Sequence, residues 1–357
     1  MKLVKIVILF ILASVGMILT GCDVHEYPDK GEESTPTVPF AIHLRFDTNM
    51  PIYQDIHYLT TRLPDTEEPS DIRYIIQAYR SDNGTDFTRQ PDYVFTFSQA
   101  SSKGLDYDAI VNLEEGYYTF LVWADYVEKG TLDDYFHITS DFQEIKYMSK
   151  EGYKGNTDRR DAFRGCVEAS KALLVTSRAE EEEREVTIPM VRPLAKFKFI
   201  ATDYQLFVRQ MLLAQQKKNE AAGKGSADES RAINPDDYRV VFRYSGFMPC
   251  SLNMYTNKPA DSWSGVTFNG ALTVLDDESE AEMGFDYVFT NGVEARVSVS
   301  VEVYDQENTM VASINPIEVP LVRSKLTIVR GDFLTTKSTG GVGINPDFAG
   351  SFDIFVP

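Results

Sequence analysis

The chain has 357 residues, with 35 Lys and Arg against 54 Asp and Glu, which gives a formal net charge of −19 at pH 7. A surface this acidic repels nucleic acid and anionic head groups, so neither is an expected partner. With 43% apolar and 12% aromatic residues the chain can fill more than one core, and its length fits two domains of ordinary size.

The first residues have the three parts of an export signal. Lys2 and Lys5 precede an apolar run from Ile6 to Leu19, and small residues follow before Cys22. The apolar run is shorter than the ~20 residues that a helix needs to cross a bilayer, which disfavours a permanent transmembrane anchor. We therefore expect residues 1–21 to be a signal peptide that is removed, and the loss of its two lysines changes the net charge from −19 to −21.

The end of this signal is more specific than its hydrophobicity. Leu19-Thr20-Gly21-Cys22 matches the bacterial lipobox, in which the cysteine thiol takes a diacylglycerol and becomes the new amino terminus. An ordinary signal peptide with a cysteine at this place is the alternative. Each buried CH₂ contributes about 0.8 kcal/mol, so two or three acyl chains hold a protein on a bilayer. The sequence predicts lipidation at Cys22, and residues 22–39, with three prolines among polar residues, predict a flexible tether.

Beyond the tether, apolar and polar side chains alternate with a period of two, which predicts strands with one buried face. The pattern is clearest from Val293 to Tyr304, where six apolar residues alternate with Glu, Arg, Ser and Tyr. Similar patterns occur at residues 40–47, 71–80, 93–97, 107–113, 117–127 and 194–200. Turns rich in Gly, Pro, Asn and Asp separate these segments, which favours antiparallel sandwiches over alternating strands and helices.

One segment departs from this pattern. Residues from Tyr204 to about Ala222 are good helix formers with an apolar face, and a Gly-Lys-Gly-Ser stretch follows them. A composition change near Arg192-Pro193 suggests a boundary between domains. The prediction is therefore an all-β protein of two antiparallel β-sandwich domains, residues 40–191 and 192–357, with one helix at about 204–222 in the second domain.

Residues for catalysis or metal binding do not form a recognisable motif. The four histidines have no paired metal-ligand spacing, no GxSxG nucleophile motif is present, and the glycines at 340–343 lack the Lys of a phosphate loop. We expect no catalytic residue, metal or cofactor. Cys166 and Cys250 remain after lipidation, and they form either one disulfide or two separate thiols. Trp123 is expected in the core, whereas Trp263, in a turn-like context, is a candidate contact for a sugar or a protein partner.

Several strings together resemble one known family, the fimbrillin-related lipoproteins of Bacteroidetes, and within it the anchor and accessory subunits of fimbriae. In order and spacing they span nearly the whole mature chain. They are GYYTFLVWADY at 116–126, RDAFRG at 160–165, RPLAKF at 192–197, GFMP at 246–249 and VRSKLTIVRG at 322–331.

This resemblance implies two transthyretin-like sandwiches, a surface-exposed outer-membrane location and no enzymatic activity. Polymerising members lose a first strand to a protease that cuts after Arg, and a strand of the neighbouring subunit fills the groove. Anchor members keep their lipid and first strand. Arg45 and Arg62 are the candidate cut points here, but neither lies in an evident exposed loop before a strand, which favours an uncut anchor.

The end of the chain is a candidate donor strand for this kind of pairing. Phe352, Ile354 and Val356 alternate with three other residues after a glycine-rich linker, although the same strand could instead close its own sheet. The hypothesis is a non-enzymatic fimbrial anchor or accessory subunit whose partners are fimbrial subunits and, through its lipid, the membrane. The alternative is a surface glycan-binding lipoprotein, and scattered carboxylates give little support to a third hypothesis, a secreted hydrolase.

Overall fold

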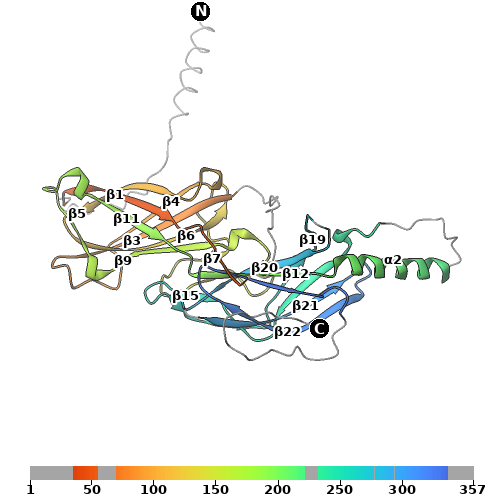
Figure 1. Ribbon diagram of the computed structural model, residues 1–357. Coiled ribbons are helices and arrows are strands. Elements are labelled where there is room, and N and C mark those ends of the chain that lie inside the picture. Colours follow the sequence, from red (N-terminus) through yellow and green to blue (C-terminus); the bar gives the residue numbers. More distant parts are fainter. Residues whose placement is uncertain (1–34, 55–69, 222–231, 277, 293, 337–357) are drawn as a thin grey trace, which may run out of the picture. The chain divides into compact units, whose positions relative to one another are not determined.

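The computed structural model describes residues 35–54, 70–221, 232–276, 278–292 and 294–336 (Figure 1). The chain divides into two units, Met1–Thr37 and Val38–Pro357. The described strands and helices lie in the second unit, except that the first strand already begins at Thr37. Within the described ranges, no helix is both long and apolar enough to span a bilayer.

The first half of the described chain is built from strands joined by turns and short 3₁₀ helices. The strands are β1 (Thr37–Phe46), β2 (Ile52–Gln54), β3 (Ser70–Ser81), β4 (Tyr93–Ala100), β5 (Tyr107–Glu114), β6 (Gly116–Glu128), β7 (His137–Ile138), β8 (Ile145–Tyr147), β9 (Ala162–Val167), β10 (Leu173–Val175) and β11 (Glu185–Met190). The 3₁₀ helices are η1 (Ser101–Lys103), η2 (Asp158–Arg160), η3 (Ala169–Lys171) and η4 (Glu181–Glu183).

The second half adds more strands, one α-helix and one further 3₁₀ helix. The strands are β12 (Leu194–Ala201), β13 (Arg239–Tyr244), β14 (Phe247–Pro249), β15 (Ser251–Asn253), β16 (Lys258–Pro259), β17 (Ser262–Ser264), β18 (Thr267–Ala271), β19 (Thr273–Val274), β20 (Ala281–Phe289), β21 (Ala295–Tyr304), β22 (Met310–Leu321) and β23 (Leu326–Gly331). The helices are α2 (Tyr204–Ala221) and η5 (Pro235–Asp237).

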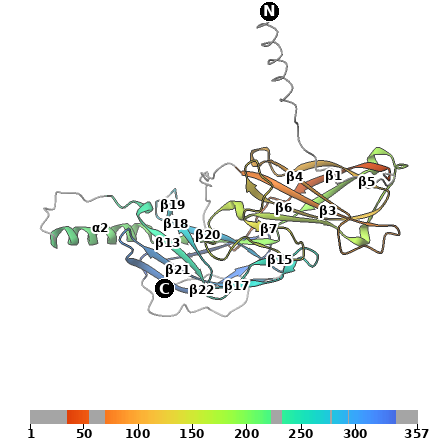
Figure 2. The same cartoon turned by 180° about the vertical axis from the view of Figure 1, so that it is seen from behind.

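These strands form two β-sandwiches, as Figure 2 also shows from the opposite side. The first packs the sheet β11-β1-β5 against the sheet β10-β6-β3-β4, with β9 also paired to β6. The second packs β19-β20-β12-β23-β2 against β18-β13-β21-β22. Two smaller sheets, β14-β17 and β16-β15-β8-β7, complete the described strands. The predicted all-β class with sandwiches and one α-helix is confirmed for the described residues.

The alternating pattern predicts the buried face of most strands correctly. In β21, Val297, Val299, Val301 and Val303 are buried, whereas the residues between them are partly exposed. In β1, Phe40, Ile42 and Leu44 are buried in the first core. Each such strand is stable because one face packs against a facing sheet and the other stays in contact with water.

Among the strands for which alternation was predicted, β3 and β6 differ from that expectation because both of their faces are buried. In β3, Tyr74 and Ile76 belong to the first core, whereas Ile75 and Tyr79 belong to the second. In β6, the buried Trp123 lies in the second core, while its neighbours in the strand lie in the first. The expectation of a single buried face was therefore wrong for β3 and β6, which separate two cores.

Three strand pairs are parallel, and the sequence did not predict them. They are β1 with β11, β12 with β23, and β2 with β23. Most remaining pairs are antiparallel, as expected. A parallel pair needs a long connection, and in both sandwiches the two parallel strands are separated by many intervening strands.

Helix α2 lies where the sequence predicted a helix. It begins directly after Asp203, whose carbonyl oxygen accepts from the N–H of Phe207 at 2.9 Å. Tyr204 and Phe207 bury its first turn against the second core. The Asp203 carboxylate also accepts from the N–H groups of Leu334 and Thr335, so one residue connects the helix start with the segment after β23.

Candidate functional site

The described body buries an arginine between two aromatic rings. The guanidinium carbon of Arg160 lies 4.0 Å from the ring centre of Tyr147 and 4.1 Å from that of Tyr153. Its Nε lies 3.1 Å from Asp286 Oδ1, and the other carboxylate oxygen accepts from the hydroxyls of Tyr153 and Tyr244 at 2.9 and 2.7 Å. Burial raises the pKa of both phenols well above the usual value, so they stay protonated and donate to Asp286.

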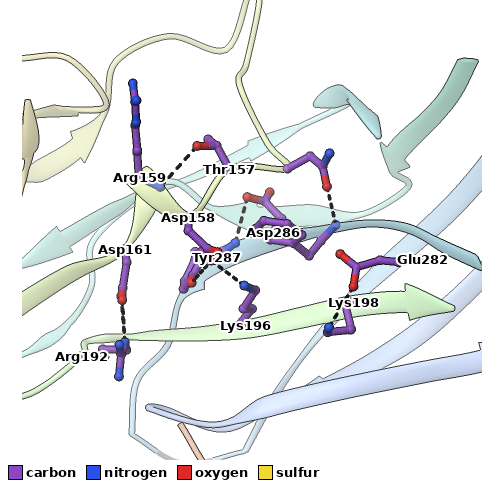
Figure 3. A network of polar contacts seen from close by, with 12 residues as sticks. Thr157, Asp158, Arg159, Asp161, Arg192, Lys196, Lys198, Glu282, Asp286 and Tyr287 are labelled. Atoms are coloured by element: carbon purple, nitrogen blue, oxygen red, sulfur yellow. Dashed lines mark hydrogen bonds and ion pairs between the residues drawn. The ribbon is translucent and has the colours of Figure 1, made fainter. Parts of the chain in front are cut away.

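Two acidic residues near Arg160 in the sequence, Asp158 and Asp161, each pair with a cation, Lys196 and Arg192 respectively (Figure 3). Lys196 Nζ lies 2.5 Å from Asp158 Oδ1, which also accepts from the hydroxyl of Tyr287 at 2.6 Å. The Nε of Arg192 donates to both carboxylate oxygens of Asp161, at 2.9 and 2.8 Å. We call the set of Asp158, Arg160, Asp161, Arg192, Lys196, Asp286 and Tyr287 the polar clasp. It brings together two of the strings that carried the family resemblance, those at 160–165 and 192–197.

The polar clasp connects separate elements of the fold. Its residues lie in or next to η2, β12 and β20, which the chain brings together from distant parts of the sequence. Its cations lie beside carboxylates, and Arg160 and Asp286 are almost fully excluded from water. A buried ion pair is costly to break once formed, because either partner alone leaves an uncompensated charge. The clasp therefore fixes the segment around η2 against β20.

A second buried polar group surrounds His137, which has no exposed surface. Its Nδ1 lies 3.5 Å from Asp125 Oδ2, too long for a strong hydrogen bond. Arg73 donates to both oxygens of Asp125 at 3.0 and 2.9 Å, so this carboxylate already has a charged partner. Burial lowers the pKa of His137, although Asp125 acts in the opposite direction. The histidine is a buried, neutral ring and is not open to a substrate.

Metal and disulfide chemistry have no support in the described residues. No group of His, Cys, Asp and Glu side chains in these ranges could hold a metal ion. Cys166 and Cys250 are both free thiols, so the second of the two possibilities that the sequence left open holds. Burial raises the pKa of the Cys250 thiol to about 12, which keeps it protonated and unreactive at neutral pH.

The outer strands of the sheets are the described features best suited to binding a protein. In the first sandwich they include β4, β5 and β11, and in the second β18 and β22. An outer strand carries a row of backbone donors and acceptors that can pair with a strand of another chain. The outer edge of β22 already forms one backbone hydrogen bond, in which the N–H of Ser313 donates to the carbonyl oxygen of Thr336 at 3.3 Å.

Arg45, a candidate cleavage point, lies inside β1, with Pro189 of β11 opposite it. Its side chain forms an ion pair with Asp108, with Nη2 2.7 Å from Oδ1. β1 is the central strand of its sheet, between β11 and β5. A protease needs an extended segment that can enter its active site. The peptide bond after Arg45 is therefore protected in the folded chain.

Trp263, the candidate aromatic contact, lies in β17 opposite Met248 of β14. Its ring is half-buried, packs against the second core and has its centre 6.5 Å from that of Tyr147. Phe247, which precedes Met248 in β14, is 75% exposed. Neighbouring strand residues point to opposite faces, so the outward aromatic side chain here is Phe247. The sequence shows Phe247 within the GFMP string but gives no signal of its exposure.

The other predicted site residues lie outside the described residues. These are the lipidation site Cys22, the second candidate cut point Arg62, and the candidate donor strand with Phe352, Ile354 and Val356. The two predicted site residues that the structure describes, Arg45 in β1 and Trp263 in β17, lie in different sheets.

Within its described ranges the chain is an all-β protein of two sandwiches, with paired buried charges and several outer strands. It belongs to DUF6562, a family of unknown function, whose match covers residues 35–355. A comparison with curated proteins gave no match.

Solved structures with some similarity to the chain include proteins from Bacteroides and Porphyromonas. One is a Bacteroides thetaiotaomicron protein provisionally described as polysaccharide-binding, with 13% identity, a TM-score of 0.40, and coverage of 78% of this chain and 80% of the other. A second is a Bacteroides ovatus protein provisionally described as an adhesin, with 10% identity, a TM-score of 0.39, and coverage of 86% and 88%. A third is the fimbrial anchor protein Mfa2 from Porphyromonas gingivalis, with 11% identity, a TM-score of 0.34, and coverage of 78% and 82%.

Proposed function

We propose that this chain is a non-enzymatic outer-membrane lipoprotein that acts as a fimbrial anchor or accessory subunit and binds its partner subunits by β-strand addition. The observation that carries the proposal is the combination of a lipobox cysteine at Cys22 with a first strand, β1, paired on both sides within the body. An anchor has to keep both its lipid and its first strand, whereas a polymerising subunit gives up both.

The buried position of β1 supports the anchor role. Phe40, Ile42 and Leu44 have at most 1% of their surface exposed. Removing the strand would expose this apolar row and the pairing edges of β11 and β5. Burying a large apolar side chain contributes about 1.5–3 kcal/mol, so the body without β1 would be strongly destabilised unless another strand replaced it.

The burial and pairing of the charged side chains in the core support a role without catalysis. The polar clasp and the His137 group are buried, and their cations have carboxylate or aromatic partners. A general acid or base has to reach a substrate and exchange a proton with it, which these buried groups do not do. Recognition through backbone edges and exposed side chains remains the activity that this body suits best.

A cysteine substitution on cells tests the proposal. Cys22→Ser should release the protein from the membrane fraction, abolish its labelling with a fatty acid and reduce the number of fibres retained on cells. Cys166→Ser is the matched control, because it removes another thiol and should leave all three readouts unchanged. A Cys22→Ser protein that stays membrane-bound and retains fibres would contradict the proposal.

The donor role of the last strand is tested separately. Ile354→Asp places a charge on the predicted inner face with Phe352 and Val356, and it should reduce fibre retention if that face enters a partner. Phe355→Asp places the same charge on the opposite face and should have a much smaller effect. If cells with either variant retain the same number of fibres, the last strand does not enter a partner. This result would not argue against the lipid anchor.

Glycan binding is a second candidate, favoured by one observation. The β14-β17 ribbon presents the exposed ring of Phe247 on one face and the half-buried Trp263 on the other. An exposed aromatic ring can stack on a sugar face. A glycan array with the wild-type chain, Phe247→Ala and Trp263→Ala tests it: binding that Phe247→Ala abolishes supports this role, and an array without hits removes it.

A further inference from the structure

The outer strand β4 differs from the other long outer strands in its chemistry. Over Tyr93–Ala100 its sequence is YVFTFSQA, with neither a charged residue nor a proline. By contrast, β5 carries Asp108 and Glu114, β11 carries Glu185 and Pro189, and β22 carries two prolines. Proteins commonly protect exposed strand edges with charges, prolines or short length, and β4 has none of these.

One edge of β4 is available for pairing. Its other edge pairs with β3 along its whole length, from Tyr93 opposite Ala78 to Ala100 opposite Asp71. Among the described strands, none pairs with the second edge, and β4 ends its sheet in both views of the molecule (Figures 1 and 2). Along Tyr93–Ala100, the backbone N–H and C=O groups of every second residue therefore point to this unpaired edge.

The side chains of β4 would gain from a further strand. Tyr93, Phe95 and Phe97 point toward the first core but stay half-buried at its border. The rings of Tyr93 and Phe95 lie 5.9 Å apart, and that of Phe97 lies 5.6 Å from Tyr107. An added strand with apolar residues at alternate positions would cover these rings. On the outer face, Val94 is 55% exposed and would also gain a neighbour.

A second copy of the same strand meets these requirements. If two β4 strands pair antiparallel about a two-fold axis at Thr96, Phe95 of each copy lies opposite Phe97 of the other. Val94 then lies opposite Ser98, and the two Thr96 residues face each other. Aromatic and threonine cross-strand pairs are favourable, and an isologous contact closes after two copies. No like charges meet at this edge, although the whole chain has a net charge of −19.

We propose that β4 pairs with β4 of a second copy, joining the two first sandwiches into a continuous sheet across a two-fold axis. This extends recognition by strand pairing from fimbrial partners to a second copy of this chain, and it does not depend on the lipid or on any fimbrial subunit. One added strand buries less area than a standard stable interface, so the pair is weak in dilute solution and favoured where the chains are concentrated.

Sedimentation equilibrium of the mature chain from residue 22, with Cys22→Ser to prevent acylation, tests the proposal. We expect a reversible monomer–dimer equilibrium at concentrations up to about 100 μM. Thr96→Lys and Thr96→Glu should each weaken it by roughly tenfold or more, because two like charges then face each other on the axis. A mixture of the two variants should restore dimers. Asn112→Lys, on the exposed face of β5, is the matched control and should leave the equilibrium unchanged.

Hydrogen exchange of the wild-type chain gives an independent reading that needs no substitution. Amides of residues 93–100 should gain protection as the concentration rises. A wild-type chain that is monomeric at every concentration, or dimers unaffected by Thr96→Lys, would overturn the proposal. So would protection of β4 that is already complete at the lowest concentration, since another segment of the chain would then occupy the edge. Each of these failures leaves the lipid anchor and the fimbrial partners untouched.

Discussion

Arg160 illustrates how this chain uses buried charge. Its guanidinium is held between two tyrosine rings and beside Asp286, so one side chain satisfies several groups at once. Replacing it with an apolar residue would leave the Asp286 carboxylate buried with neutral donors only, namely two tyrosine hydroxyls and the backbone N–H of Tyr287. The loss of a charge partner in such a site is more costly than the loss of the contact itself.

We expect Arg160→Leu to lower the free energy of unfolding by about 3–5 kcal/mol, the range found when one partner of a buried ion pair is removed. Urea denaturation followed by circular dichroism measures this change. Lys218→Met is the matched control, because Lys218 pairs with Glu307 at the exposed surface, and it should change the unfolding midpoint very little. Similar losses in the two variants would show that Arg160 has no special role.

His137 gives a prediction about pH. Its folded pKa lies below 6.5 because burial opposes the charged form, and Asp125, Arg73 and Arg160 are the charged groups that act on it. The unfolded histidine gains a proton near pH 6.5, whereas the folded one does not. The stability of the folded chain should therefore fall as pH drops below about 6.5, by at most about 1.4 kcal/mol per pH unit from this residue.

His137→Phe should remove this part of the pH dependence, because an aromatic ring fits among Trp123, Tyr147 and Phe289 without a titrating group. Unfolding free energies of both proteins at pH 5 and pH 7 give the comparison. A wild-type chain whose pH dependence equals that of the variant would contradict the assignment.

Individual site residues were only partly predictable from the sequence. The core position of Trp123 followed from the apolar strand around it, and two free thiols were one of two possibilities. The partners of Arg160 and His137 could not be predicted, since Asp286 lies 126 residues after Arg160 and no local pattern links them. Exposure of Phe247 was also hidden, because a strand residue faces water or the core according to pairings made elsewhere.

The alternation of apolar and polar residues predicted well where the strands lie, but it predicted poorly what packs beside them. It placed β1, β4, β5, β6, β12 and β21 close to their observed ranges. It failed for the second faces of β3 and β6, where the residues between the expected core positions also pack against apolar groups. Parallel pairs such as β1 with β11 were missed because register and direction depend on the whole topology.

Close packing between elements gives a prediction at Gly165 in β9. A Cβ atom there would lie 2.5 Å from the sulfur of Met190 and 2.7 Å from a methyl carbon of Ile188, both in β11. Gly165→Ala should therefore destabilise the chain by about 1–3 kcal/mol, the usual cost of overpacking. Gly246→Ala is the control, since its nearest neighbour would be 3.7 Å away. Equal thermal unfolding midpoints for the two variants would refute the packing argument.

For the whole molecule, the proposed function joins an amino-terminal lipid to a body that recognises protein strands. The sequence suggested a domain boundary near Arg192, and the residues that form each core bear on this boundary. The first core draws only on residues 38–190, whereas the second also takes in side chains of β3 and β6. Strands that separate two cores transmit strain between them, so the two sandwiches are expected to unfold together.

The amino terminus of the mature protein on cells tests the central claim most directly. Mass spectrometry of the protein released from washed outer membranes would identify it. The proposed function predicts a terminus at Cys22 carrying acyl chains, with β1 still attached. A terminus after Arg45 or Arg62, without lipid, would contradict it and would identify a subunit that gives up its first strand.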